Sequence, residues 1–308
     1  MFVSRTQAGA GNSSVEHQTK RLRRLGLALW GACYALKKGV NHLCFPQYLS
    51  VEQMLTLAAD AGFDGFELSV GEDGEMGYAR DPSELASVAL QASQRGLELH
   101  SVSTILHWSY PLSSVDRSVR ERGLAIGTFM LRAASVVGAD SILIVPGVAD
   151  PEVPYMDTYR IAQESVQALS EPAAELGVRI GVENVWNRFL QSPLEMLRFI
   201  EEIGSPLVGT YLDVGNLMAW NYPQHWIQVL GDHIVKVHVK DFSSEVGNIH
   251  GFTYLLHGNV PWVGVIRELK AVGYDDYLTA ELSPAENFTE RLTHEISESL
   301  TAIIEEDG

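Results

Sequence analysis

The chain has 308 residues, of which 46% are hydrophobic and 20% are charged. This composition supports a full hydrophobic core and excludes wholesale disorder, and the length suits one large domain or two ordinary ones. The formal net charge of −17 argues against nucleic acid or a membrane surface as a partner, because both are anionic. The only cysteines, Cys33 and Cys44, lie too close in sequence for a useful disulfide framework, so we expect a cytoplasmic location.

The first 38 residues differ from the remainder in charge. They carry seven Lys or Arg and one Glu, which leaves −23 for the other residues. The basic patch at 21–24 and the apolar run behind it loosely resemble a secretory signal. However, the run is too short to span a membrane, and no small-x-small cleavage site follows it. We therefore predict that residues 1–38 are a disordered or leader-like extension, followed by one catalytic domain at 39–308.

Strand and helix signals alternate along the rest of the chain. The helices between the strands begin at caps such as Ser50 and Ser192, and most of them end at a glycine. Short apolar runs predict strands at residues 39–44, 65–70, 97–103, 141–145, 178–183, 208–213, 234–241 and 277–281. Eight such units predict parallel strands with right-handed crossovers, which is an α/β fold of the (β/α)8 TIM-barrel type. A doubly wound sheet is the alternative, but no G-x-G-x-x-G follows the first strand.

Four of the predicted strands carry a side chain able to bind a metal at or near their ends. They are Glu183, Asp213, His238 and Glu281, spaced 30, 25 and 43 residues apart. Each alone fits an ordinary role as an ion-pair partner, a turn residue or a core histidine. A barrel, however, gathers the carboxyl ends of its strands at one face, so the four would share a single ion. One His and three carboxylates suit Mn²⁺ first, and also Mg²⁺, Co²⁺ or Zn²⁺.

The segments around these residues carry a resemblance to a known family. The sequences GVEN at 181–184, LDVGN at 212–216, VHVKD at 237–241 and TAEL at 279–282 resemble the sugar phosphate isomerase/epimerase family with xylose isomerase-like barrels. The similarity covers about residues 38–305, and it is closest to L-xylulose 5-phosphate 3-epimerase-like and hexulose-phosphate isomerase-like proteins. The resemblance implies that the four residues bind one divalent metal. It also implies that Glu183 and Glu281 are paired acid/bases on opposite faces of a ketose.

Two positions depart from the ketohexose 3-epimerases of this family. Asn216 stands where those enzymes have a His three residues after the metal-binding Asp, and Ser244 stands where they have an Arg six residues after the metal-binding His. Both family residues help to hold a free ketohexose, so these departures argue against that particular substrate.

Other residues near the predicted strand ends are candidates for contact with substrate. An aromatic face stacks well on a sugar, and amide, imidazole and charged groups bind hydroxyls or orient a metal-bound histidine. The candidates are His107, Trp108, Asn184, Asn216, Lys240 and Asp241, with Glu67 and His42 as further strand-end residues. The expected partner is a small-molecule sugar or sugar phosphate, and a homo-oligomer is left open.

The expected activity is metal-dependent proton transfer on a ketose or ketose phosphate through a metal-bound enediolate, giving epimerisation or isomerisation. The alternative is a metal-dependent lyase or dehydratase acting on a keto-sugar or inosose through the same enediolate. A DNA-repair endonuclease with this barrel would need a basic groove, which the charge of −23 opposes. A non-catalytic sugar-binding barrel would have little use for two opposed acids on a metal.

Overall fold

A computed structural model describes residues 36–306 of the chain. The predicted N-terminal extension lies outside this range except for its last three residues, and its disorder stays a prediction. Lys37 and Lys38 already belong to the first strand, so regular structure begins two residues before the expected domain boundary. Within residues 36–306, no helix combines the length and apolarity needed to cross a membrane.

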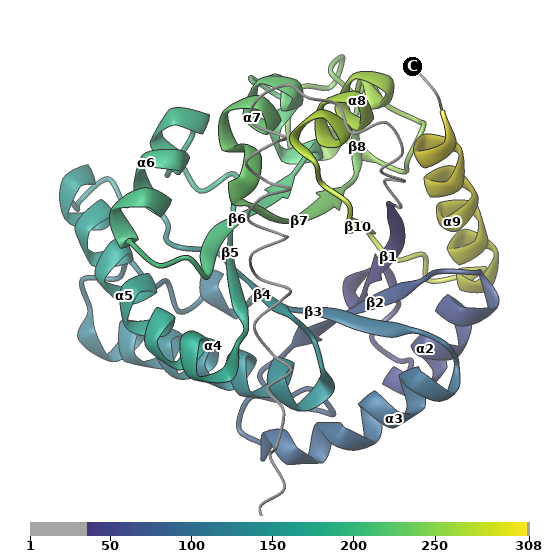
Figure 1. The fold of residues 1–308 in the computed structure, drawn as a ribbon, viewed down its shortest axis with the longest axis horizontal. Coiled ribbons are helices and arrows are strands. Elements are labelled where there is room, and N and C mark those ends of the chain that lie inside the picture. The colour runs from purple at the N-terminus through teal and green to yellow at the C-terminus, as the bar shows by residue number, and fades with distance from the viewer. Residues whose placement is uncertain (1–35, 307–308) are drawn as a thin grey trace, which may run out of the picture. The chain divides into compact units, whose positions relative to one another are not determined.

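Eight parallel strands form a closed barrel, as predicted (Figure 1). β1 pairs with β2 on one side and with β10 on the other, which closes the ring. The barrel strands are β1 (Lys37–Asn41), β2 (Gly65–Val70), β3 (Glu98–Thr104), β4 (Ser141–Ile144), β5 (Arg179–Glu183), β6 (Val208–Asp213), β7 (Ile234–Val239) and β10 (Tyr277–Ala280).

Helices surround the barrel on its outside (Figure 1). They are α2 (Val51–Asp60), α3 (Ala86–Gln94), α4 (Arg117–Val137), α5 (Tyr155–Leu176), α6 (Pro193–Ile203), α7 (Pro223–Leu230), α8 (Trp262–Val272) and α9 (Thr289–Glu305). Their buried faces pack on the outward-facing side chains of the strands, which forms the main apolar core.

The caps predicted from sequence explain several helix boundaries. Ser50 and Gln53 form a complete capping box at the start of α2. The box predicted at Ser192 is only half formed, because the Glu195 carboxylate accepts from the backbone N–H of Gln191 instead. Helices α4, α5, α6 and α8 end at glycines with left-handed backbone, Gly138, Gly177, Gly204 and Gly273.

Two strands end at least two residues earlier than the sequence predicted. β1 stops at Asn41 because its side chain accepts a hydrogen bond from the Leu43 N–H and starts a 3-10 turn. β7 stops at Val239. The next residues, β8 (Asp241–Phe242), leave the barrel and pair antiparallel with β9 (Phe252–Thr253). The loop after β7 therefore begins with a small two-stranded sheet of its own.

Large polar side chains fill the inside of the barrel, and glycines on nearby strands make room for them. A Cβ at Gly181 would lie 2.9 Å from the Tyr211 side chain, and one at Gly65 would lie 2.5 Å from the Tyr277 ring. Such contacts are too close for any other residue. The barrel interior can therefore hold Tyr211 directly beneath the strand ends, where its ring packs 4.5 Å from that of His238.

Candidate metal centre

The four predicted ligands come together at the carboxyl ends of the strands. Glu183 and Asp213 close β5 and β6, His238 lies near the end of β7, and Glu281 directly follows β10. One ligand atom from each residue lies within 4.8 Å of the others. Opposite ligands of an octahedral divalent ion lie about 4.2 Å apart. A slight closure of this strand-end cluster would therefore place all four around one ion.

The His238 ring is oriented as a metal ligand should be. Its Nε2 lies 2.7 Å from Glu67 Oε1. Its Nδ1 is buried, makes no hydrogen bond, and lies 3.4 Å from Glu183 Oε1. A metal-bound histidine commonly has its other nitrogen fixed by a carboxylate. The unpartnered Nδ1 and the fixed Nε2 therefore fit a divalent ion on the Nδ1 side.

Glu67 is part of a buried network inside the barrel. The Tyr211 hydroxyl and the Asn41 side-chain amide both donate hydrogen bonds to its carboxylate. Burial alone would raise the pKa of Glu67, but His238, His100 and the Tyr211 hydroxyl outweigh burial and lower it to about 2. Glu67 is therefore a permanent carboxylate that holds His238 in place.

The sequence offers Glu67 as a strand-end candidate for substrate contact, whereas the structure places it inside β2, where it contacts His238. The sequence did contain a signal for this role. An acid within a strand that is otherwise apolar or small must have a polar partner, because an unpaired buried charge is costly.

Asn184 and Asn216 position Asp213. The Asn184 amide accepts from the Asp213 N–H at 2.9 Å and donates to the Asp213 carbonyl at 2.8 Å. The Asn216 N–H donates to Asp213 Oδ1 at 2.8 Å. The other oxygen, Oδ2, lies 2.6 Å from Lys240 Nζ. Both asparagines thus direct one carboxylate oxygen toward the cluster.

The strand-end cluster carries more negative than positive charge. Burial, together with the charges of Glu281 and Asp213, raises the pKa of Glu183 to about 7. Burial alone would lower the pKa of His238, but Glu67, Glu281 and Glu183 raise it well above its usual value. Both shifts show that the site favours added positive charge, whether it comes from protons or from a metal ion. The donor set therefore fits a divalent cation.

Comparison with known proteins agrees with this geometry. The family model described as "Xylose isomerase-like TIM barrel" matches residues 55–302. The chain belongs to this family.

A curated relative is the putative L-ribulose-5-phosphate 3-epimerase SgbU of Escherichia coli K12. It is 30% identical over 246 residues, which cover 77% of this chain and 85% of that protein. Among solved structures, L-ribulose 3-epimerase superposes with a TM-score of 0.72 at 21% identity, covering 88% of this chain and 95% of that one. The structure of D-psicose 3-epimerase in the presence of D-fructose superposes with a TM-score of 0.72 at 16% identity. The match covers 87% of this chain and 98% of that one. The structures confirm the predicted fold, and the curated relative places the chain among isomerase-class enzymes.

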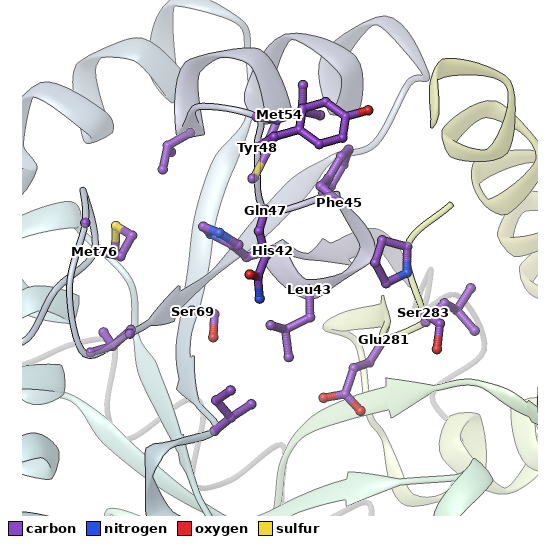
Figure 2. A pocket seen from close by; sticks show the side chains of 18 of the residues that line it. His42, Leu43, Phe45, Gln47, Tyr48, Met54, Ser69, Met76, Glu281 and Ser283 are labelled. Atoms are coloured by element: carbon purple, nitrogen blue, oxygen red, sulfur yellow. The ribbon is translucent and has the colours of Figure 1, made fainter. Parts of the chain in front are cut away.

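A cavity of about 1210 Å³ opens beside the cluster in this family member. Figure 2 shows Glu281 projecting into it from one side, whereas Tyr48 and Met54 lie across from it and Met76 lies at another edge. Of the eight residues named as candidates for contact with substrate, Lys240 and His42 line this cavity. The loops after β1 and β2 supply most of the wall opposite Glu281, and no motif in the sequence marked them.

The structure gives the other expected contacts different surroundings. His107 is fully buried, and its Nε2 lies 3.2 Å from the Gly123 carbonyl oxygen in α4. Trp108 is 44% exposed and is not part of the cavity wall. Asp241 accepts hydrogen bonds from the Phe242 and Val260 N–H groups, so it anchors the loop after β7. None of these three residues faces the cluster.

Proposed function

We propose that the chain is a metal-dependent ketose epimerase that inverts the carbon next to the carbonyl group. The observation that carries the proposal is the group of three strand-end carboxylates and one histidine, with His238 Nδ1 left free of hydrogen bonds. Membership of a family with epimerase relatives supports the same reaction. We also propose a cytoplasmic location, which the free, buried thiol of Cys44 suits.

Glu183, Asp213, His238 and Glu281 would hold the ion. When bound, it supplies positive charge that acidifies the C–H bond beside the substrate carbonyl. Mn²⁺ suits a donor set of one nitrogen and three carboxylates, and Mg²⁺, Co²⁺ and Zn²⁺ are the alternatives to test.

Glu183 and Glu281 are the proposed acid and base. Inversion at one carbon needs a base on one face of the substrate and an acid on the other. The two carboxyl groups come from β5 and from the end of β10, on separate sides of the barrel. Burial raises the pKa of Glu183 to about 7, so this group can carry a proton near neutral pH. Burial would also raise the pKa of Glu281, but Lys240 and His238 outweigh it and lower the pKa. Carboxyl groups with divergent pKa values are typical of an acid–base pair.

Proton exchange in D₂O tests this assignment. Glu183→Gln and Glu281→Gln keep the side-chain shape and one ligand oxygen, so both should retain metal, but each should lose turnover by about 10²–10⁴-fold. Each variant keeps one base, so each should still exchange the proton of one epimer without converting it, and the two variants should exchange opposite epimers. Identical exchange by both variants, or near-normal turnover by either, contradicts the two-base mechanism. A product lighter by the mass of water would indicate the dehydratase alternative.

A further inference from the structure

The curated relatives of this chain are named for a phosphorylated sugar, whereas the similar solved structures are named for free ketoses. The cavity wall of this chain is acidic. Within residues 36–306, its charged side chains are the carboxylates Glu72, Asp73, Glu75 and Glu281 and the ammonium group of Lys240. His42 also lines the cavity, but burial lowers its pKa to about 4, so it is neutral at physiological pH. Glu72 is paired with Arg122, which does not line the cavity. The other carboxylates, Asp73, Glu75 and Glu281, still outnumber the one ammonium group, so a phosphate dianion would enter an acidic space.

The cation on the cavity wall is already paired. Lys240 Nζ lies 2.6 Å from Asp213 Oδ2 and also forms an ion pair with the Glu281 carboxylate. Both partners belong to the proposed metal site. A phosphate group could recruit Lys240 only by taking it away from two buried carboxylates, which would leave their charges less compensated.

The helix N-terminus at the cavity is also capped by the protein itself. A helix N-terminus can bind phosphate through its free N–H groups. In α2, however, the Val51 N–H donates to Glu75 Oε2 at 2.9 Å, and the Gln53 N–H donates to Ser50 Oγ at 3.3 Å. Val51, Ser50 and Glu75 all line the cavity. The position that a phosphate would take at this helix already holds a carboxylate.

Size does not account for the choice of substrate. The cavity volume of about 1210 Å³ exceeds the range of about 300–1,000 Å³ that is common for small-molecule sites. A phosphorylated pentulose or hexulose would fit sterically. Electrostatics must therefore decide between the free sugar and its phosphate ester. Carboxylates accept hydrogen bonds from hydroxyl groups, and Tyr48 and Phe252 add aromatic faces to the same wall.

Resting on the proposed epimerase function, we propose that the substrate is an uncharged ketose and not a ketose phosphate. Its hydroxyl groups would face the acidic wall formed by the loop at residues 72–75 and the start of α2, while its carbonyl end would face the strand-end cluster.

Matched pairs of sugars test this proposal. The Mn²⁺-loaded protein would be assayed in D₂O with L-ribulose and its 5-phosphate, and with D-fructose and its 6-phosphate. In at least one pair, the free sugar should exchange its proton with a kcat/KM higher by about tenfold or more, because like charges repel the ester. Added salt screens this repulsion, so it should bring the kcat/KM values of the free sugar and the ester closer together. An ester preferred in every active pair overturns this inference but leaves the epimerase function intact. An absence of exchange with all four sugars counts against both.

Single-charge variants show whether the acidic wall is the cause. Glu75→Gln removes a charge and keeps an oxygen that can accept from Val51, so it should raise the ester's kcat/KM relative to the free sugar about two- to fivefold. Glu52→Gln is the matched control, because Glu52 lies in the first turn of α2, to which the Glu75 carboxylate is bonded, and it pairs with Arg95 and does not line the cavity. Asp73→Asn makes the same test on the exposed loop if Glu75→Gln does not fold. Equal ratios for the tested variant and the control would overturn the electrostatic explanation.

Discussion

Two clusters of charged side chains lie at opposite ends of this barrel, and they are balanced differently. The strand-end cluster at the carboxyl ends joins Glu183, Asp213, His238 and Glu281. At the amino ends, a basal cluster joins Lys236, Arg179, Asp140 and Asp276. Lys236 Nζ lies 2.9 Å from Asp140 and 2.5 Å from Asp276, and Arg179 contacts the same two aspartates.

The basal cluster has two cations for two carboxylates, so its charges compensate each other without a ligand. The strand-end cluster has three carboxylates, and one nitrogen of its histidine has no hydrogen-bond partner. Lys240 forms ion pairs with Asp213 and Glu281, but its single charge leaves the three carboxylates in excess. A buried excess of like charge is costly to fold unless a ligand offsets it. The comparison teaches that burial of charge does not by itself indicate a functional site. An imbalance of charge is the more informative sign.

The largest expected difference between the clusters is in metal binding. Asp213→Ala should abolish stoichiometric binding of Mn²⁺, because it removes a ligand from the ion. Asp276→Ala makes the same change in the basal cluster and should leave metal content unchanged. Elemental analysis of both purified variants after dialysis measures the difference. Full metal content in Asp213→Ala would show that the strand-end cluster is not the binding site.

Glu67→Gln tests whether the network beneath the cluster tunes the metal ligand. Gln keeps the shape of the side chain but removes the charge that holds His238, so metal affinity should fall about 10–100-fold. Glu98→Gln is a matched control, because Glu98 pairs with Lys37 and contacts Tyr277 away from the strand-end cluster. Calorimetric titration with Mn²⁺ gives both affinities. Equal affinities in the two variants would mean that Glu67 only packs.

Lys236→Met should affect stability and leave metal binding unchanged. The Lys236 side chain is 2% exposed, but Asp140 and Asp276 are 51% and 25% exposed, so water can partly solvate them after the change. We therefore expect a loss of about 1–2 kcal/mol in the free energy of unfolding, below the cost of breaking a fully buried pair. Urea unfolding at saturating Mn²⁺ measures it. A fall in metal affinity instead would indicate that the two ends of the barrel are coupled.

The two clusters should also respond to different ranges of pH. Without metal, Glu183 keeps its proton up to a pKa of about 7, whereas the unfolded chain releases it near 4.5. Its contribution to stability therefore falls as pH rises between these values. Burial alone would raise the pKa of Asp140, but Lys236 and Arg179 outweigh it and lower the pKa. The contribution of Asp140 to the free energy of unfolding is therefore present above a pH of about 4 and is lost below it.

Metal binding must displace the Glu183 proton, which gives a measurable pH dependence. Apparent Mn²⁺ affinity should rise by about tenfold or more per pH unit up to about pH 7. The rise should continue above about pH 7, because the pKa of His238 is also raised and its Nδ1 must lose its proton to bind the ion. Titration in buffers of different ionisation enthalpy would count the released proton. A flat profile from pH 5.5 to about 7 would contradict the raised pKa of Glu183.

The sequence by itself determined the barrel and the four residues that meet in the strand-end cluster. Regular alternation of buried runs and capped helices allows few architectures, and a barrel brings the strand ends together whatever the details of its loops. Glu183 and Asp213 could therefore be placed correctly without coordinates, since each closes an apolar run. For Asn184 and Asn216, the sequence indicated a position near the strand-end cluster. It could not show that the Asn184 side chain and the Asn216 backbone N–H bind Asp213, or that the Asn216 side chain donates to the Asn184 carbonyl.

Only the tertiary structure decided which partners the remaining polar groups have. Glu67 and His238 are 171 residues apart, and their contact depends on which faces of β2 and β7 point into the barrel. His107 follows β3 in a short turn, and the carbonyl of Gly123 in α4 determines where its ring points. The cavity wall consists of loops, whose paths follow no periodic pattern of hydrophobic residues. Local patterns therefore specified the scaffold and the residues of the strand-end cluster. The orientation of side chains and the charge of the cavity arise from contacts between segments that are distant in sequence.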